Sequence, residues 1–294
     1  MSERTQSQRW LFGPAPDLLL GCGIGYAALV IGFALAGIED EAIGVLGLVP
    51  LVSILTGTPH YGATLLRVYE QREERRTYAF FAVWVTAAVW ALFYAGLYSY
   101  ALGSLLLTAY LSWSPWHYTG QNYGIAVMFL RRRGVPFSPR AKRMLYLSFL
   151  LSFALTLLAL HGGQAGGEYA SVQPYPGGSF RMLRIGIPYR AWACAFGVVG
   201  VAYLGTLLAA GAMLLRCARP RELVPVAALV LTQALWFSLP TALRIWGAIG
   251  PGAALDTRLT AYAFFWVATG HSVQYLWITS YYAAGRATPA ERWR

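Results

Sequence analysis

Residues 78–98, YAFFAVWVTAAVWALFYAGLY, form a stretch of 21 residues without a charged side chain. An α-helix needs about 20 apolar residues to cross the hydrocarbon core of a bilayer, so this stretch predicts a transmembrane helix. Seven further segments have a comparable length and apolar character, near residues 17–37, 43–66, 101–130, 144–161, 190–215, 223–247 and 259–284. The sequence therefore predicts an all-α fold, a bundle of about eight transmembrane helices that forms a single integral membrane domain, residues 1–294.

The overall composition supports a membrane protein and excludes several functions. Hydrophobic residues make up 57% of the chain and charged residues only 12%, whereas a soluble domain carries roughly 25% charged residues. The single lysine, Lys142, lies in a basic loop, which excludes a retinal pigment because its Schiff base needs a lysine within a span. The three cysteines, Cys22, Cys194 and Cys217, are far apart and predict neither a disulfide framework nor a thiolate metal site.

The basic residues are distributed unevenly between the connections. Eighteen of the 23 lysines and arginines fall in the two chain ends and in the loops after the second, fourth and sixth predicted spans. Because cytoplasmic loops are rich in Lys and Arg, this pattern places both termini in the cytoplasm. The net charge of +11 is then explained by topology and by contact with the lipid bilayer, and it does not indicate a nucleic-acid partner. We expect a multi-pass protein of the cell membrane, of the bacterial inner-membrane type.

Three of the four histidines lie within predicted spans, each in a short polar cluster. His60 lies in GTPHYGATLLR, His117 in SPWHYTGQNYG and His271 in ATGHSVQYLWI. Ionisable residues at bilayer depth are costly and usually functional. Counted from the cytoplasmic ends of their helices, His117 and His271 lie roughly 21–22 Å deep and His60 roughly 10 Å deep. Local unwinding around Pro59 and Pro115 would reduce this offset.

These histidines predict a metal site. The segments around them contain no carboxylate or thiolate, and three neutral imidazoles suit iron, copper or zinc rather than magnesium or calcium. Three ligands would leave coordination positions open for oxygen or water. In an apolar cavity the natural substrate is a lipid, and dioxygen is the natural partner of ferrous iron. We therefore expect His60, His117 and His271 to bind Fe²⁺.

Several polar residues are placed to support this site. Gln121 lies one turn below His117, and Gln274 and Tyr275 lie one turn below His271. We interpret Gln121, Gln274 and Tyr275 as catalytic residues that orient the histidines or the substrate. Thr56 and Thr64 flank His60 on its helix face.

Other residues around these spans allow two interpretations. Gln233, in the middle of the seventh span, could line the same cavity. The glycines near the histidines, Gly57, Gly62, Gly120, Gly124 and Gly270, are typical of tight helix packing.

One external connection is long, residues 162–189, and rich in Gly and Pro. A loop of this length is often functional or mobile, so it could cover an opening between helices or serve only as a connector. His161, at the start of this loop, is expected at the membrane interface. It would become a fourth ligand if the loop folds inward.

The motifs TPHYG and WHYTGQNYG resemble the paired His-Gly motifs of the Brp/Blh-type membrane carotene dioxygenases. In that family, histidines are taken to hold a ferrous iron that cleaves β-carotene at its central double bond to give retinal. The resemblance implies that His60 corresponds to the first motif and His117 to the second, with His271 in place of the later histidines.

Taken together, the sequence predicts an integral membrane metalloenzyme, a non-haem iron oxygenase that acts on a carotenoid, an isoprenoid or another lipid. Two alternatives belong to other classes. The protein could be a membrane transporter or lipid-binding protein in which the histidines line a path. It could also be an assembly protein in which the histidines bond helices together, or bind haem through His117 and His271.

Overall fold

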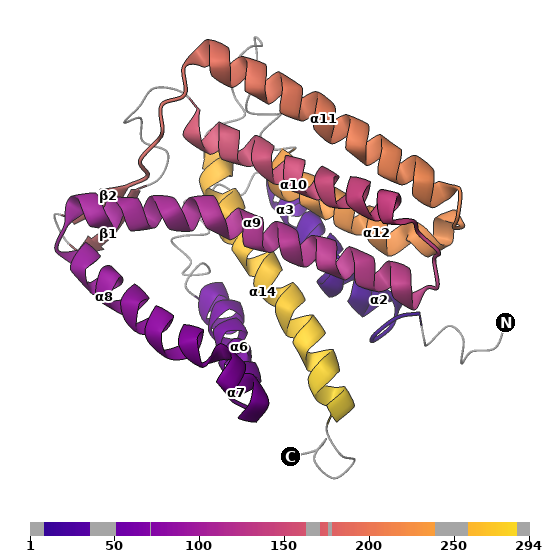
Figure 1. Cartoon of the computed structure of the whole chain (residues 1–294), viewed down its shortest axis with the longest axis horizontal. Coiled ribbons are helices and arrows are strands. Elements are labelled where there is room, and N and C mark those ends of the chain that lie inside the picture. Colours follow the sequence, from indigo (N-terminus) through magenta and orange to yellow (C-terminus); the bar gives the residue numbers. More distant parts are fainter. Residues whose placement is uncertain are drawn as a thin grey trace.

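The computed structural model describes residues 9–35, 51–70, 72–162, 171–175, 178–238 and 258–286. Within these ranges the chain is almost entirely helical, with one small two-stranded hairpin (Figure 1). The all-α fold class predicted from hydrophobic patterning is therefore confirmed for the described residues.

The first part of the chain forms helical segments that include several π-helical turns. They are α2 (Pro14–Pro16), η1 (Asp17–Gly21), α3 (Ile24–Leu35), η2 (Ser53–Gly57), α6 (Thr58–Glu70), α7 (Arg72–Ala79), η3 (Phe80–Val85) and α8 (Thr86–Leu97). The second part contains α9 (Tyr100–Arg132), α10 (Pro139–His161), α11 (Tyr189–Leu215), α12 (Pro220–Gln233), η4 (Ala234–Ser238) and α14 (Arg258–Arg286). The described helices overlap the predicted spans, but the span 17–37 is interrupted at Cys22 and Gly23, and α10 begins five residues before the predicted start at 144. Residues 36–37, 43–50 and 239–247 of the predicted spans lie outside the described residues.

Among the described residues, three helices are long and apolar enough to cross a membrane: Arg76–Leu97, Pro139–His161 and Tyr189–Leu215. On α11, the side chains of Val198, Val201 and Leu208 are 64–74% exposed, as expected of a helix face that contacts lipid. The polar clusters around His117 and His271 lower the mean apolarity of α9 and α14, although both helices are long enough to span.

Helix α9 is the central element of the fold, and it packs against α8, α10, α12 and α14 (Figure 1). The Ser99 side chain accepts a hydrogen bond from the backbone N–H of Leu102 at the N-terminus of α9, an N-cap that satisfies a donor left free by the first turn. Pro115 is buried near the middle of α9. The local unwinding expected there is not observed, because α9 continues as one helix of 33 residues.

The main hydrophobic core lies where α9, α10, α12 and α14 meet. Phe129, Phe149, Leu229 and Trp277 are at most 5% exposed in this core. The buried Asp17 carboxylate accepts hydrogen bonds from the backbone N–H groups of Leu11 and Phe12 and from the Trp277 indole N–H. These bonds fix the segment before α2 against α14, and they give the buried carboxylate the donors that it requires.

The long connection between α10 and α11 contains a β-hairpin that the sequence did not predict. Strands β1 (Ser171–Tyr175) and β2 (Gly178–Arg181) pair antiparallel, and the following residues lie along the first turns of α9. There the backbone N–H groups of Arg181 and Leu183 donate to the hydroxyls of Ser104 and Thr108. Since these α9 residues precede the histidine cluster by two turns or more, the described part of the loop fastens to the fold and does not enter the site.

Candidate metal centre

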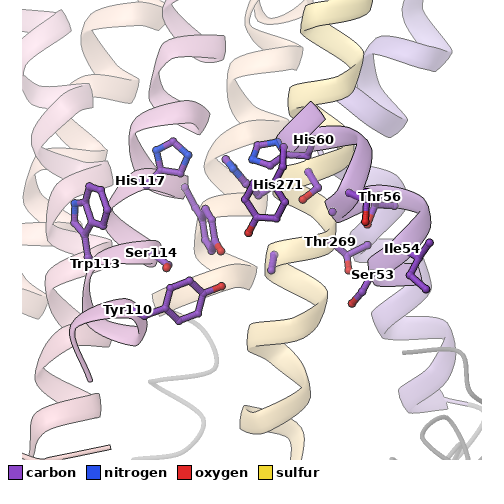
Figure 2. Close-up of a pocket in the computed structure, with 16 residues that line it drawn as sticks. Ser53, Ile54, Thr56, His60, Tyr110, Trp113, Ser114, His117, Thr269 and His271 are labelled. Atoms are coloured by element: carbon purple, nitrogen blue, oxygen red, sulfur yellow. The ribbon is translucent and has the colours of Figure 1, made fainter. Parts of the chain in front are cut away.

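The structure brings together the three histidines that the sequence singled out. His60 comes from α6, His117 from α9 and His271 from α14. The ring centroid of His271 lies 5.0 Å from that of His60 and 4.8 Å from that of His117. Figure 2 shows the three imidazoles at one end of a shared cavity. We refer to His60, His117 and His271 as the histidine cluster.

The depth offset predicted for His60 is therefore much too large. Helix α6 ends at Glu70 rather than at Arg67, which places His60 about 15 Å from the end of its helix instead of about 10 Å. Helix α14 also runs obliquely past α6 (Figure 1), so that positions at different heights on the two helices become neighbours.

The imidazole nitrogens of this cluster lack the hydrogen bonds that buried polar groups normally make. His271 is 2% exposed. Within the described part of the chain, neither of its ring nitrogens has a hydrogen-bond partner, and the same is true of Nδ1 of His60. An unsatisfied buried polar atom costs roughly 1–3 kcal/mol. Among the described residues, these nitrogens therefore make no hydrogen bond between helices.

The histidines open into a cavity of about 740 Å³, a volume typical of small-molecule sites. Its lining comes from η2 and the start of α6, from α9 and from α14. Serine, threonine and tyrosine side chains dominate this lining, and none of the described lining residues is charged. Apolar atoms nevertheless form most of its exposed surface, so the cavity is largely apolar, with scattered hydroxyl groups and no charged group among its described lining residues.

Two tyrosine rings pack against the histidine cluster. The Tyr118 ring centroid lies 4.3 Å from that of His271, and the Tyr275 ring centroid lies 4.5 Å from that of His60. The hydroxyl of Thr64 lies within hydrogen-bonding distance of the backbone carbonyl of His60, at 3.0 Å, and of the Tyr275 hydroxyl, at 3.1 Å. Tyr275, predicted as a catalytic residue, thus contacts His60 through its ring.

The other two predicted catalytic residues hold the helices in place. The amide N–H₂ of Gln121 donates to the backbone carbonyl of His271 and to Oε1 of Gln274, at 3.0 and 3.1 Å. Gln274 is fully buried, and its own amide donates to the backbone carbonyl of Gly21. Neither glutamine lines the cavity. Both glutamines act on the site through the backbone of α14. The bond from Gln121 to the backbone carbonyl of His271 fixes the residue that carries the central imidazole.

Gln233 and His161 also lie outside the cavity. The Gln233 side chain bonds to Thr119, Asn122 and the backbone of Phe149, and it is 2% exposed. Nε2 of His161 lies 2.8 Å from the hydroxyl of Ser112, so His161 is engaged between α10 and α9. The interpretation of Gln233 as a cavity residue is wrong, and the structure does not place His161 as a fourth ligand.

The glycines near the histidines differ in their surroundings. A Cβ atom added at Gly270 would lie 2.9 Å from the Trp236 ring, so this glycine is required by close packing. At Gly57, Gly62, Gly120 and Gly124 no described atom lies within 4 Å of such a Cβ. The predicted tight packing is therefore observed at Gly270 alone among these five.

The ring spacing is close to that of imidazoles on a common ion. With a metal–nitrogen bond of about 2.1 Å and the ring centre about 1.1 Å further out, ligands at 90–110° would have centroids roughly 4.5–5.3 Å apart. The observed spacings of 4.8 and 5.0 Å fall in this range. Two axial ligands of a haem would instead have centroids about 6.4 Å apart, further than the 4.8 Å between His117 and His271.

The side-chain rotamers do not form a complete ligand set. Among the described residues, no group of three or more His, Cys, Asp or Glu side chains is arranged to hold a metal ion as it stands. Binding would therefore require rotation of one or more imidazoles. His60 is partly buried and His117 is exposed. Both border the cavity, so their side chains have room to rotate.

Several cavity residues were missed by the sequence interpretation. On α9, the residues Tyr110, Ser114 and Tyr118 line the cavity at intervals of four, the spacing of one helix face. On α14, the cavity residues Ala268 and Ser272 follow the same interval. This spacing was present in the sequence, and it could have identified the cavity faces of both helices once the histidines had been singled out.

Comparison of the chain with protein-family models, with curated proteins and with solved structures found no match.

Proposed function

We propose that this protein is an integral membrane metalloenzyme, a non-haem iron oxygenase that acts on a carotenoid, an isoprenoid or another lipid. His60, His117 and His271 hold the metal. The observation that carries the proposal is the central position of His271, buried between the rings of His60 and His117 with both of its nitrogens unpartnered in the described part of the chain. A metal ion would satisfy a nitrogen that the protein leaves without a hydrogen bond.

The surroundings of the cluster support the proposal of iron and a lipid substrate. No described acidic or thiolate side chain lines the cavity, which favours a metal that accepts imidazole ligands. The lining residues Tyr61, Trp113 and Ile54 are 62–65% exposed. In a membrane these side chains would face lipid, and a substrate would reach the cavity from the bilayer without crossing water.

The proposal includes the membrane topology and the resemblance to the Brp/Blh-type carotene dioxygenases. Eight transmembrane helices with both termini in the cytoplasm would place the excess of basic residues on the cytoplasmic side. Thr64 and Asn122 occupy positions where that family carries acidic residues after its motifs. Because of this difference, we propose that the protein is a relative of that family that keeps the histidine site and acts on a different lipid.

The residues around the cluster would hold and orient it. Ferrous iron, when bound, would supply the activation of dioxygen. Gln121 and Gln274 fix the backbone of α14 at His271, and the Tyr275 ring limits the orientations open to His60. The Tyr118 ring packs against His271, the buried member of the cluster.

The test is the metal content of detergent-purified protein, measured by elemental analysis for wild type and for His117→Ala. We expect near-stoichiometric iron in wild type and its loss in the variant. His161→Ala is the matched control, because His161 lies in the same fold but outside the cavity, and it should keep the iron. Absence of iron from wild type, even after anaerobic loading with Fe²⁺, would overturn the proposal.

A further inference from the structure

The cavity beside the histidine cluster combines a largely apolar surface with hydroxyl groups. Nine of its lining side chains carry a hydroxyl group: Ser53, Thr56, Thr58, Tyr61, Tyr110, Ser114, Tyr118, Thr269 and Ser272. They come from all three helical segments that enclose the cavity. The apolar surface suits a hydrocarbon chain, but a plain hydrocarbon would offer these hydroxyl oxygens no hydrogen bond.

Part of the hydroxyl lining lies away from the imidazoles, although Tyr61 and Tyr118 pack beside His60 and His271. Figure 2 shows the three histidines at one end, with Ser53, Tyr110 and Thr269 toward the other. A ligand that filled the cavity would place one end among the hydroxyls and would bring the adjoining atoms past the imidazoles. The two ends of the cavity therefore select different features of the same ligand.

The chemistry of the lining selects a hydroxyl group on that ligand. Serine and threonine in helices commonly donate to the backbone four residues earlier, as Thr56 does to the carbonyl of Val52. A side chain bonded in this way keeps lone pairs that accept hydrogen bonds but has no further proton to give. A ligand hydroxyl can donate to such an oxygen and can accept from a neighbouring hydroxyl, whereas an ether or a ketone can only accept.

The same lining disfavours an anionic lipid. No lysine or arginine is among the described residues that line the cavity, and an unpaired carboxylate or phosphate is expensive to bury. A charged head group would therefore bind less well than a neutral one of the same size.

We infer that the cavity binds the hydroxyl-bearing end of a neutral lipid, such as an isoprenoid alcohol or a hydroxylated carotenoid, with the carbon chain leaving past Trp113 toward the bilayer. This inference rests on the proposed function for the reaction at the histidines. The binding preference itself depends only on the cavity, so it can be measured in protein without metal.

The test compares three C20 lipids that differ only at one end: geranylgeraniol, geranylgeranoic acid and the matching hydrocarbon. Retention of each radiolabelled lipid by immobilised, metal-free protein in detergent would be measured at equilibrium. We expect the alcohol to bind about tenfold more tightly than the hydrocarbon, as one to two net hydrogen bonds would give, and more tightly than the acid. Equal binding of alcohol and hydrocarbon, preference for the acid, or no binding of any of the three would overturn the inference.

Variants locate the preference within the protein. Ser114→Ala combined with Thr269→Val should abolish it, and Thr269→Ser alone, which keeps the hydroxyl, should retain it. Ser152→Ala is the control, because Ser152 is a fully buried serine on α10 outside the cavity. A double variant that kept the full preference would contradict the assignment. Wild type that takes up no iron after anaerobic loading with Fe²⁺, yet prefers the alcohol, would overturn the proposed function and leave this inference standing.

Discussion

Helix α9 carries two clusters of polar side chains close together, and the structure uses them in opposite ways. On one side, Thr119 and Asn122 face Gln233 of α12, whose amide donates to Thr119 and accepts from Asn122, both at 2.9 Å. We call these three residues the glutamine cluster. On the other side, His117 belongs to the histidine cluster, whose central imidazole has no hydrogen-bond partner among the described residues.

The difference teaches how a membrane bundle distinguishes structural from functional polar residues. Hydrogen bonds in the glutamine cluster connect α9, α10 and α12, so its polar atoms are committed to the packing of helices. The side chains of the histidine cluster make few hydrogen bonds between helices, and they open into a cavity. We interpret the first cluster as a device for stability and the second as a site kept available for a ligand.

The largest effect expected from this comparison is the loss of metal in His271→Ala. Because His271 stands between the other two rings, its removal leaves two separate imidazoles, and the iron content should fall at least tenfold. Elemental analysis after anaerobic loading measures the loss. Gln233→Ala is the matched variant from the glutamine cluster, and it should keep its iron in whatever fraction remains folded. Equal iron in both variants would remove the distinction between the clusters.

A second prediction compares the same substitution in both clusters of metal-free protein. Gln233→Leu deletes three hydrogen bonds, which in membrane proteins contribute about 0.6 kcal/mol each, so the free energy of unfolding should fall by about 2 kcal/mol. His271→Leu removes two nitrogens that have no partner among the described residues, so stability should stay constant or rise by about 1 kcal/mol. Reversible unfolding in mixed detergent micelles measures both. A larger loss for His271→Leu than for Gln233→Leu would show that the histidine is structural.

Much of the fold could be predicted because hydrophobic stretches report burial in lipid directly. The segments 101–130 and 190–215 became α9 and α11 with boundaries that differ by at most two residues. The hairpin of β1 and β2 could not be predicted, because its pairing depends on the tertiary position of the loop on α9. The Pro115 region stayed helical, because the loss of one backbone hydrogen bond is tolerated where neighbouring helices pack around the proline.

The candidate site was predictable in its histidines and not in its supporting residues. An imidazole in an apolar span is conspicuous in a sequence, and helical position limits where it can lie. An amide one turn away can equally face the histidine, the next helix or the backbone, and Gln274 faces the backbone of Gly21 and the side chain of Gln121. Which partner it meets depends on how helices distant in sequence cross, and no local pattern contains that information.

Gln274→Ala tests the structural role that the geometry gives this glutamine. The variant loses the bonds to Gln121 and to the carbonyl of Gly21 inside a fully buried environment, so unfolding should be easier by about 1–2 kcal/mol. Iron binding should weaken only a few fold, because the imidazoles remain. Thermal unfolding and iron titration on one preparation measure the two effects. A complete loss of iron with unchanged stability would instead support the direct role at the site that the sequence suggested.

The smallest effect is expected for Tyr275→Phe, which separates the ring of Tyr275 from its hydroxyl. In the described part of the chain the hydroxyl bonds to the exposed Thr64 alone, so its removal should change the free energy of unfolding by less than about 0.5 kcal/mol. Iron affinity should stay within twofold, because the ring that packs against His60 is retained. Tyr275→Ala, which removes the ring, should weaken iron binding several fold. A Tyr275→Phe protein that binds iron and lipid normally but consumes no oxygen would show that the hydroxyl takes part in the reaction, and would move Tyr275 from a positioning role to a catalytic one.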